Sequence, residues 1–224
     1  MSNITTMTEF ILLGFSEVQE LQLVHAALFL LVYLAALMGN LLIVAVTTLD
    51  RRLHTPMYFF LRNLSLIDLC FISTTVPKSI LNSLSNRQSI SFLGCVSQVF
   101  SYLMFAATDL IFLTVMSYDR YVAICCPLRY YVTMDQGACW KMVVASWLGG
   151  GLYALMNTTA TFSCHLCGPR VIHQFFCDIP QLLKLICPGE AQAEISALAP
   201  ISGGLSYLDL LVSVFYALGY AAPQ

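Results

Sequence analysis

An acidic and a basic residue, Asp119 and Arg120, are adjacent at the end of a long apolar run. Both lie within the stretch Tyr118–Cys125. At the end of a membrane helix such a pair has few partners except each other and the water just beyond. The pair can therefore act as a latch, which a cytoplasmic protein opens by offering the arginine a better partner. Basic residues gather wherever a helix leaves a bilayer, so Arg120 alone would indicate little.

Three other carboxylates interrupt apolar runs, at Asp68, Asp109 and Asp209. An ionised side chain in mid-membrane costs roughly 2.5–3.5 kcal/mol on insertion scales, so it normally faces a bundle interior or a wet cavity. An intramembrane enzyme or a transporter could use such acids. However, they lie on separate runs without a supporting histidine or Gly-Asp motif, and no inverted repeat is visible. We therefore expect no catalytic residues, no cofactor and no enzyme activity.

The composition indicates that lipid surrounds most of this chain. Hydrophobic residues make up 58% of the 224 residues and charged residues only 10%, whereas a soluble domain carries roughly 25% charged residues. The mean hydropathy is +0.78. The net charge of −2 gives no reason to expect a nucleic acid or a strongly charged substrate as a partner.

Apolar runs of about 20 residues are needed to cross a bilayer core that is about 30 Å thick. Five runs of this sequence qualify. They predict an all-α membrane protein with five transmembrane helices rather than a β-barrel, whose strands would be short and alternating. The predicted spans are Ala26–Leu49, Pro56–Ile80, Phe92–Tyr118, Met142–Ala160 and Ile201–Tyr220.

Basic residues predict how the chain is oriented in the membrane. Arg51 and Arg52 follow the first span directly. Arg120 and Arg129 fall in the next loop on the same side. Because cytoplasmic loops carry an excess of Lys and Arg, the amino terminus is predicted to lie outside. We therefore expect a multi-pass protein of the plasma membrane, with a glycosylation acceptor at Asn3 in an Asn-Ile-Thr triplet.

Five of the nine cysteines fall on the predicted outer side: Cys95, Cys164, Cys167, Cys177 and Cys187. The secretory lumen is oxidising, so these thiols are expected to pair, and their odd number leaves one over, expected to be Cys164. A zinc cluster is an alternative, because three of these cysteines lie close to His173. Since the spacing matches no common zinc motif and the loop is extracellular, no metal is expected.

Three stretches of this sequence together resemble a known family. They are Leu53–Leu61, Asn63–Cys70 and Met116–Cys125, which read LHTPMYFFL, NLSLIDLC and MSYDRYVAIC. Each is similar to a signature of the olfactory receptors, a branch of the rhodopsin-like G-protein-coupled receptors. The resemblance implies a rhodopsin-like helical bundle that detects small volatile odorants and activates a stimulatory G protein.

The external stretch that holds the cysteines also resembles this family. The parts similar to the second extracellular loop of olfactory receptors are Cys167–Pro169, His173–Pro180 and Leu183–Cys187. By that resemblance Cys177 bonds to Cys95, and Cys167 bonds to Cys187. The bond to Cys95 would hold the loop as a lid over the mouth of the bundle. Closing so long a loop contributes roughly 3–5 kcal/mol to stability by the chain-entropy estimate.

The resemblance also assigns roles to residues inside the predicted bundle. The coupling switch would be Asp119, Arg120 and Tyr121, with the arginine released when an odorant shifts the receptor to its active form. Asp68 would share a polar network with Asn40 and could hold a sodium ion. A protonated Asp68 that is satisfied by one neighbouring helix is the alternative.

An odorant site should be a largely apolar cavity with one or two polar groups. Residues of the third span recur at helical spacing, and the upper part of this helix lines the ligand cavity in the resembled family. The predicted pocket residues are Val99, Tyr102, Leu103, Ala106 and Ala107. Ordinary helix packing is the alternative for each of them, and Asp109 further along the helix has an expected structural role.

After Cys187 the sequence departs from the olfactory receptor pattern. Leu208–Tyr216 resembles the start of the family's seventh helix, so we expect an internal deletion that joins the second external loop to the last helix. A divergent fifth helix followed by early termination is the alternative. The predicted organisation is an extracellular segment 1–24, helices with their loops 25–160, a disulfide-bonded loop 161–194 and a final span 195–224.

The sequence is therefore compatible with two functions. The first is an odorant receptor whose partners are a small odorant, a stimulatory G protein, membrane lipid and other receptor copies. The alternative is a truncated receptor fragment that does not signal and is retained in the endoplasmic reticulum or pairs with full-length receptors.

Overall fold

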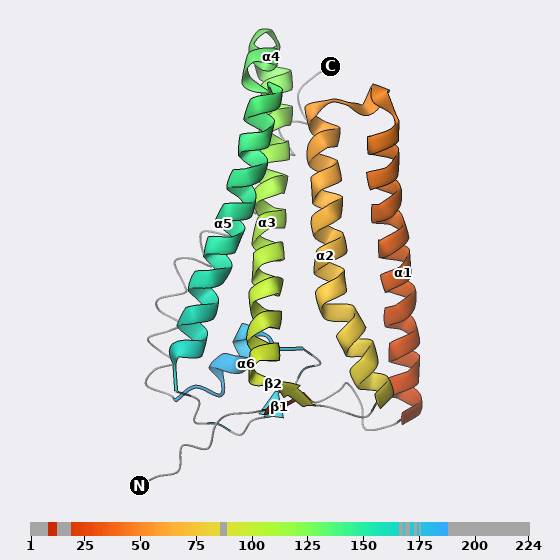
Figure 1. The fold of residues 1–224 in the computed structure, drawn as a ribbon, viewed down its shortest axis with the longest axis vertical. Helices are drawn as coiled ribbons and strands as arrows, with labels where there is room; N and C mark the ends of the chain where they lie inside the picture. Colours follow the sequence, from red (N-terminus) through yellow and green to blue (C-terminus); the bar gives the residue numbers. More distant parts are fainter. Residues whose placement is uncertain are drawn as a thin grey trace.

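Four long helices form the body of the computed structural model, which describes residues 9–12, 19–85, 89–165, 168, 171–172, 174 and 176–187. They are α1 (Gln19–Leu49), α2 (Pro56–Ser85), α3 (Phe92–Cys125) and α5 (Gln136–Ser163). They run alongside one another in Figure 1, and α3 packs against both α2 and α5. The predicted all-α bundle is confirmed for this part of the chain.

Three of these helices are long and apolar enough to cross a membrane, judged by length and composition over the described residues. The qualifying segments are Leu23–Leu49, Pro56–Pro77 and Phe92–Cys125. The predicted fourth span, Met142–Ala160, is a continuous part of α5, which is less apolar and is not one of the three. The predicted fifth span and the segment likened to a seventh helix lie outside the described residues.

The ends of the helices follow from local sequence. The Ser91 side chain accepts a hydrogen bond of 3.1 Å from the Gly94 N–H and so begins α3. Asp135 begins α5 in the same way, through the Ala138 N–H at 3.0 Å. Pro77 lies inside α2, and Figure 1 shows that helix bending in its lower part, as a proline in a helix interior requires.

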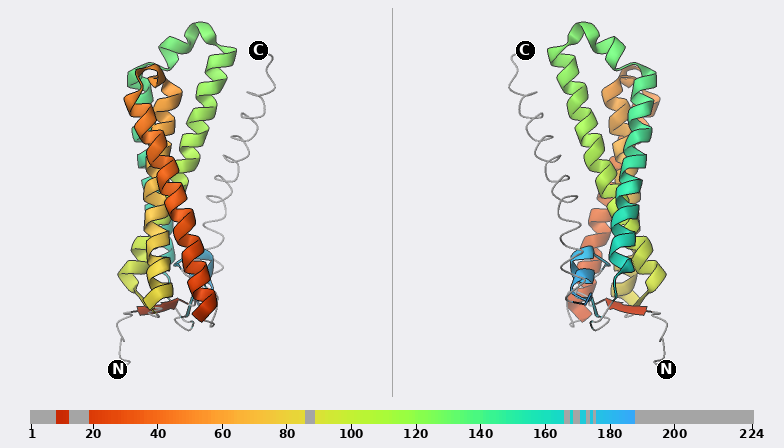
Figure 2. Two further views of the ribbon diagram at one scale, coloured as in Figure 1. Left: turned by 90° about the vertical axis from the view of Figure 1, so that its right-hand side faces the viewer. Right: turned by 90° about the vertical axis from the view of Figure 1, so that its left-hand side faces the viewer.

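Short elements close the bundle at its two ends. At one end, the 3-10 helices η1 (Arg51–Leu53) and η2 (Pro127–Arg129) and the short helix α4 (Tyr130–Thr133) connect the long helices. The helix α6 (Ile179–Leu183) lies at the other end, as both side views in Figure 2 show. We call these the Asp119 end and the disulfide end.

A small sheet covers the disulfide end. Its strands are β1 (Glu9–Leu12), β2 (Ser89–Ser91) and β3 (Val171–Ile172), and β1 lies in the centre. Phe10 pairs with Ile90 in the antiparallel β1–β2 ladder, and Leu12 pairs with Ile172 in the parallel β1–β3 ladder. These four side chains are almost completely buried, so the sheet joins the amino-terminal segment to the segments of β2 and β3 through both hydrogen bonds and apolar contact.

The interface between α3 and α5 is built from small residues. Ser146, Gly150 and Ala154 recur every fourth residue of α5 and are all buried. A Cβ atom at Gly150 would lie 2.0 Å from Thr108 Oγ1 and 3.0 Å from the Met104 carbonyl oxygen. The glycine therefore permits a close approach of the two backbones, which is how membrane helices gain packing contacts in the absence of a hydrophobic driving force.

Candidate functional site

The carboxylate of Asp119 is held by a tyrosine. Asp119 is only 2% exposed, and the Tyr130 hydroxyl donates a hydrogen bond of 3.0 Å to its Oδ1. Pro127 begins η2, and this turn brings Tyr130 of α4 back beside the end of α3. Sequence analysis missed Tyr130, although the turn signal at Pro127 indicated that the following residues could return to the helix end.

Arg120 has a different partner. Its side chain is exposed, and the guanidinium contacts the Met57 sulfur in the first turn of α2. Over the residues that the structure describes, no ion pair joins it to Asp119, although its charge still acts on that carboxylate. Each of the two side chains has a further contact of its own. The acid is buried beneath α4, while Arg120 and the neighbouring Tyr121 remain on the surface.

The helix that carries these residues is longer than expected. The third span was predicted to end at Tyr118, but α3 continues to Cys125. Hydropathy shows only where the apolar residues end. The helix itself continues as long as successive residues form backbone hydrogen bonds, whether or not their side chains are apolar. Asp119 and Arg120 therefore project from regular helix on different sides, which separates their side chains and explains their different partners.

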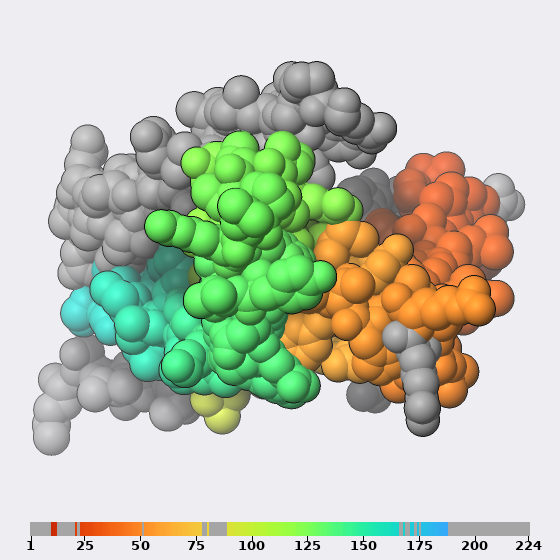
Figure 3. Space-filling model, turned by 90° about the horizontal axis from the view of Figure 1, so that it is seen from above, coloured from red at the N-terminus to blue at the C-terminus, as the bar shows by residue number. Residues whose placement is uncertain are grey.

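The Tyr130 hydroxyl is protonated at physiological pH, and its surroundings strengthen this. Removal from water and the nearby negative charge of Asp119 raise the pKa of Tyr130 to about 12. The phenol thus remains a hydrogen-bond donor throughout the physiological pH range. Figure 3 shows the Asp119 end from above. The green segments around α4 and the orange start of α2 form much of the surface seen there.

Replacing Tyr130 with phenylalanine should destabilise the bundle by about 1.5–3 kcal/mol, because the buried Asp119 carboxylate loses its hydrogen-bond donor. Thermal unfolding of the purified protein in detergent measures the change. Tyr131→Phe is the matched control, since Tyr131 undergoes the same chemical change at 87% exposure. Equal destabilisation by the two substitutions would show that the bond to Asp119 contributes nothing.

A disulfide bond defines the opposite end. Cys95 in the first turn of α3 is bonded to Cys177, with 5.5 Å between their Cα atoms. The Cys177 N–H also donates a hydrogen bond of 3.1 Å to Gln98 Oε1 on α3, so the loop is attached twice to the same helix. Cys187 is disulfide-bonded as well. Its expected partner Cys167 lies outside the described residues, as does the predicted glycosylation acceptor Asn3.

The predicted pocket residues divide into two groups. Val99 and Ala107 are 1% and 3% exposed, and Val99 packs in the apolar cluster beneath the sheet. Tyr102, Leu103 and Ala106 are partly exposed. The Tyr102 ring lies between two other aromatic rings, 5.2 Å from Phe71 of α2 and 5.8 Å from Phe176 beside Cys177, measured between centroids. The pocket itself stays a prediction.

The predicted polar network is arranged differently from expectation. Asn40 donates a hydrogen bond of 3.1 Å to the Ala36 carbonyl of its own helix, and the structure describes no hydrogen bond from it to Asp68. The Asp109 carboxylate of α3 instead lies close enough to Asp68 of α2 for their charges to interact. The sequence places the two acids on separate helices, and only helix packing brings them within electrostatic range of each other.

Known proteins resemble this chain along most of its length. Residues 39–220 match the family model of the 7 transmembrane receptor (rhodopsin family). Olfactory receptor 14A16 of Homo sapiens is 58% identical over 88% of this chain and 63% of its own length. Olfactory receptor 14I1 of Homo sapiens is 60% identical over 83% of this chain and 60% of its own length. The chain thus spans less than two thirds of the relatives that it matches.

Proposed function

Because the chain belongs to the rhodopsin family of seven-transmembrane receptors, and within it to the olfactory receptors, we propose that it detects small odorants and activates a stimulatory G protein. Like its family, it is a multi-pass membrane protein. The observation that carries the proposal is the arrangement at the Asp119 end. There the acid is bound by Tyr130, so that Arg120 and Tyr121 remain on the surface for a partner protein.

The proposed orientation puts the disulfide end outside the cell and the Asp119 end in the cytoplasm. Disulfides form and persist in oxidising compartments, which supports an outer location for the bond between Cys95 and Cys177. Arg120 and Arg129 lie at the opposite end, in accord with the excess of basic residues in cytoplasmic loops. The four predicted parts, 1–24, 25–160, 161–194 and 195–224, and glycosylation at Asn3 belong to the same proposal.

The odorant site is proposed to lie beneath the outer loop, on the upper part of α3. The pocket residues are Val99, Tyr102, Leu103, Ala106 and Ala107. Tyr102 supplies one hydroxyl in an otherwise apolar surface, which suits small ligands with at most one polar group. Gln98 adds a donor, since its Nε2 group is buried without a hydrogen-bond partner among the described residues. A ligand that moved the Tyr102 ring would act on both α2 and the loop, because Phe71 and Phe176 pack against it.

Odorant binding is proposed to shift the population of the bundle towards a form whose cytoplasmic end binds the G protein. Arg120 leaves Met57 in that form and contacts the partner, while the bond between Asp119 and Tyr130 keeps the end of α3 in place. Asp68 and Asn40 are proposed to share the polar network that could hold sodium, and Asp109 lies close enough to Asp68 to contribute to it. Membrane lipid and further receptor copies complete the proposed partners.

A cAMP assay in cells that express the tagged chain tests the function. An odorant panel should contain compounds that raise cAMP, and Arg120→Ala should abolish that response while the amount of protein at the surface is unchanged. Arg129→Ala is the matched control, because Arg129 is an exposed arginine of η2 outside the predicted switch. A response that persists in Arg120→Ala, or a surface-exposed chain that no odorant activates, would contradict the proposal.

A further inference from the structure

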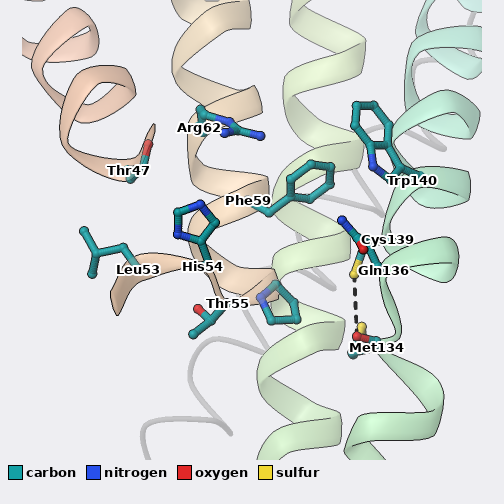
Figure 4. Close-up of a pocket in the computed structure, with 11 residues that line it drawn as sticks. Thr47, Leu53, His54, Thr55, Phe59, Arg62, Met134, Gln136, Cys139 and Trp140 are labelled. Carbon is teal, nitrogen blue, oxygen red and sulfur yellow. Dashed lines mark hydrogen bonds between the residues drawn. The ribbon is translucent and has the colours of Figure 1, made fainter. Parts of the chain in front are cut away.

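A cavity of about 420 Å³ lies at the Asp119 end, between the end of α1, the start of α2 and the start of α5 (Figure 4). Aromatic, basic and neutral polar side chains line it together. Those that bear on its chemistry are Thr47, His54, Phe59, Arg62, Gln136 and Trp140. None of them belongs to the predicted switch or to the predicted odorant pocket.

The arginine of this cavity lies over the aromatic ring of Phe59. The Arg62 guanidinium carbon lies 5.6 Å from the centre of the Phe59 ring, and Phe59 meets Trp140 edge to face with 5.1 Å between centroids. Arg62 is only partly exposed and lies within an apolar helix. Within the described part of the chain no carboxylate forms an ion pair with it. A charged side chain in a membrane helix normally faces a wet cavity or pairs with another polar or charged group.

The charges around the cavity favour an anion. Among the described residues that line it, none is acidic, whereas Arg62 and His54 are basic. Three acids lie near the cavity without lining it, and the charges of two of them, Asp119 and Asp135, reach Cys139 of the lining. Asp50 accepts a hydrogen bond of 2.9 Å from the Arg52 N–H, and Asp135 accepts one of 3.0 Å from the Ala138 N–H. The Arg62 guanidinium is thus the permanently charged group among the described lining residues, and a phosphate group matches its forked donors.

The position of the cavity indicates where such a phosphate comes from. Arg62 lies six residues after Pro56, the first residue of α2, or about 9 Å along the helix axis. Trp140 is 51% exposed, and tryptophan is enriched where membrane helices pass the lipid headgroups. The cavity thus lies at headgroup depth, beside the leaflet that carries anionic lipids if this end faces the cytoplasm.

We propose that this cavity binds the phosphate-bearing headgroup of an anionic membrane lipid. Arg62 forms charge-assisted hydrogen bonds to the phosphate, and Gln136 and His54 complete its polar surroundings. Phe59 and Trp140 pack against the apolar part of the same lipid. The inference rests on the proposed orientation, which places this end in the cytoplasmic leaflet, but not on odorant detection.

The full-length chain in nanodiscs tests the inference, with labelled phosphatidylinositol bisphosphate as the probe and phosphatidylcholine as the background lipid. The chain should bind the probe, and Arg62→Gln should weaken binding by roughly tenfold, the effect expected for losing a hydrogen bond to a charged group. Arg62→Lys should retain part of the affinity, since it keeps the charge but not the fork. Arg129→Gln removes an exposed arginine outside the cavity and should leave binding unchanged.

Thermal unfolding confirms that each variant is folded. Unchanged binding by a folded Arg62→Gln variant, or an equal loss in Arg129→Gln, would overturn the inference. Competition by soluble inositol bisphosphate or inorganic phosphate at the same concentration as the lipid would show a soluble phosphate as the occupant and overturn the lipid assignment. The cAMP assay is independent, so loss of lipid binding with an intact odorant response refutes this inference alone.

Discussion

Replacing Gly150 with valine should prevent α5 from packing against α3 and should cost more than about 3 kcal/mol. The added Cβ would lie 2.0 Å from Thr108 Oγ1, and 3.0 Å from both the Met104 carbonyl oxygen and the Thr108 nitrogen. A side chain can turn aside, but the two backbone atoms can move only if the helices separate. The yield of monodisperse protein after extraction and its thermal unfolding temperature measure the effect.

Gly151 provides the matched control for this substitution. A Cβ at Gly151 meets nothing within 4 Å, and valine has the same intrinsic helix propensity at both positions. Gly151→Val should therefore leave the bundle nearly unchanged. Thr108→Ala should rescue Gly150→Val only in part, because the contact with the Met104 carbonyl remains. Similar yields and unfolding temperatures for both valine variants would disprove the role assigned to Gly150.

Replacing Cys95 or Cys177 with serine should remove the folded receptor from the cell surface. The bond closes a loop with a sequence separation of 82, which corresponds to about 4.5 kcal/mol by the chain-entropy relation. Both cysteines are completely buried in the cluster beneath the sheet, so each serine also leaves a hydroxyl among apolar side chains. Surface labelling of the tagged chain and its unfolding temperature report the loss.

The controls use the other cysteines of the chain. Cys70 is an exposed thiol on α2 outside any disulfide, so Cys70→Ser should have little effect. The double variant Cys95→Ser/Cys177→Ser should have nearly the same unfolding temperature and surface level as either single variant, because each of the three variants removes the same bond. Single variants that matched the unmodified chain at the surface would exclude a structural role for this bond.

Hydropathy predicted the helices but only some of their ends. Leu49 ends both the predicted first span and α1, because Asp50 and the arginines after it mark the change in composition. Phe92 begins both the predicted third span and α3, where Ser91 caps the helix. The other end of α3 was misplaced at Tyr118, because charged residues end an apolar run without ending a helix.

Contacts between distant segments could not be predicted from single residues. The strand β1 contains only four residues, and the sequence does not show that Ile11 and Leu12 pair with Val171 and Ile172. Likewise, three consecutive glycines are visible at 149–151, but only helix packing shows that Gly150 is the one facing the backbone of α3. The partner of Asp119 was missed for the same reason, since Tyr130 is reached through a turn rather than along a helix.

The central place of β1 in its sheet has a consequence for how the chain is made. Ribosomes deliver β1 first, yet its parallel neighbour β3 emerges roughly 160 residues later, after all four long helices. One edge of β1 therefore stays unpaired until the helices that precede β3 have been synthesised. Assembly of this sheet is thus a late event in the biogenesis of the chain.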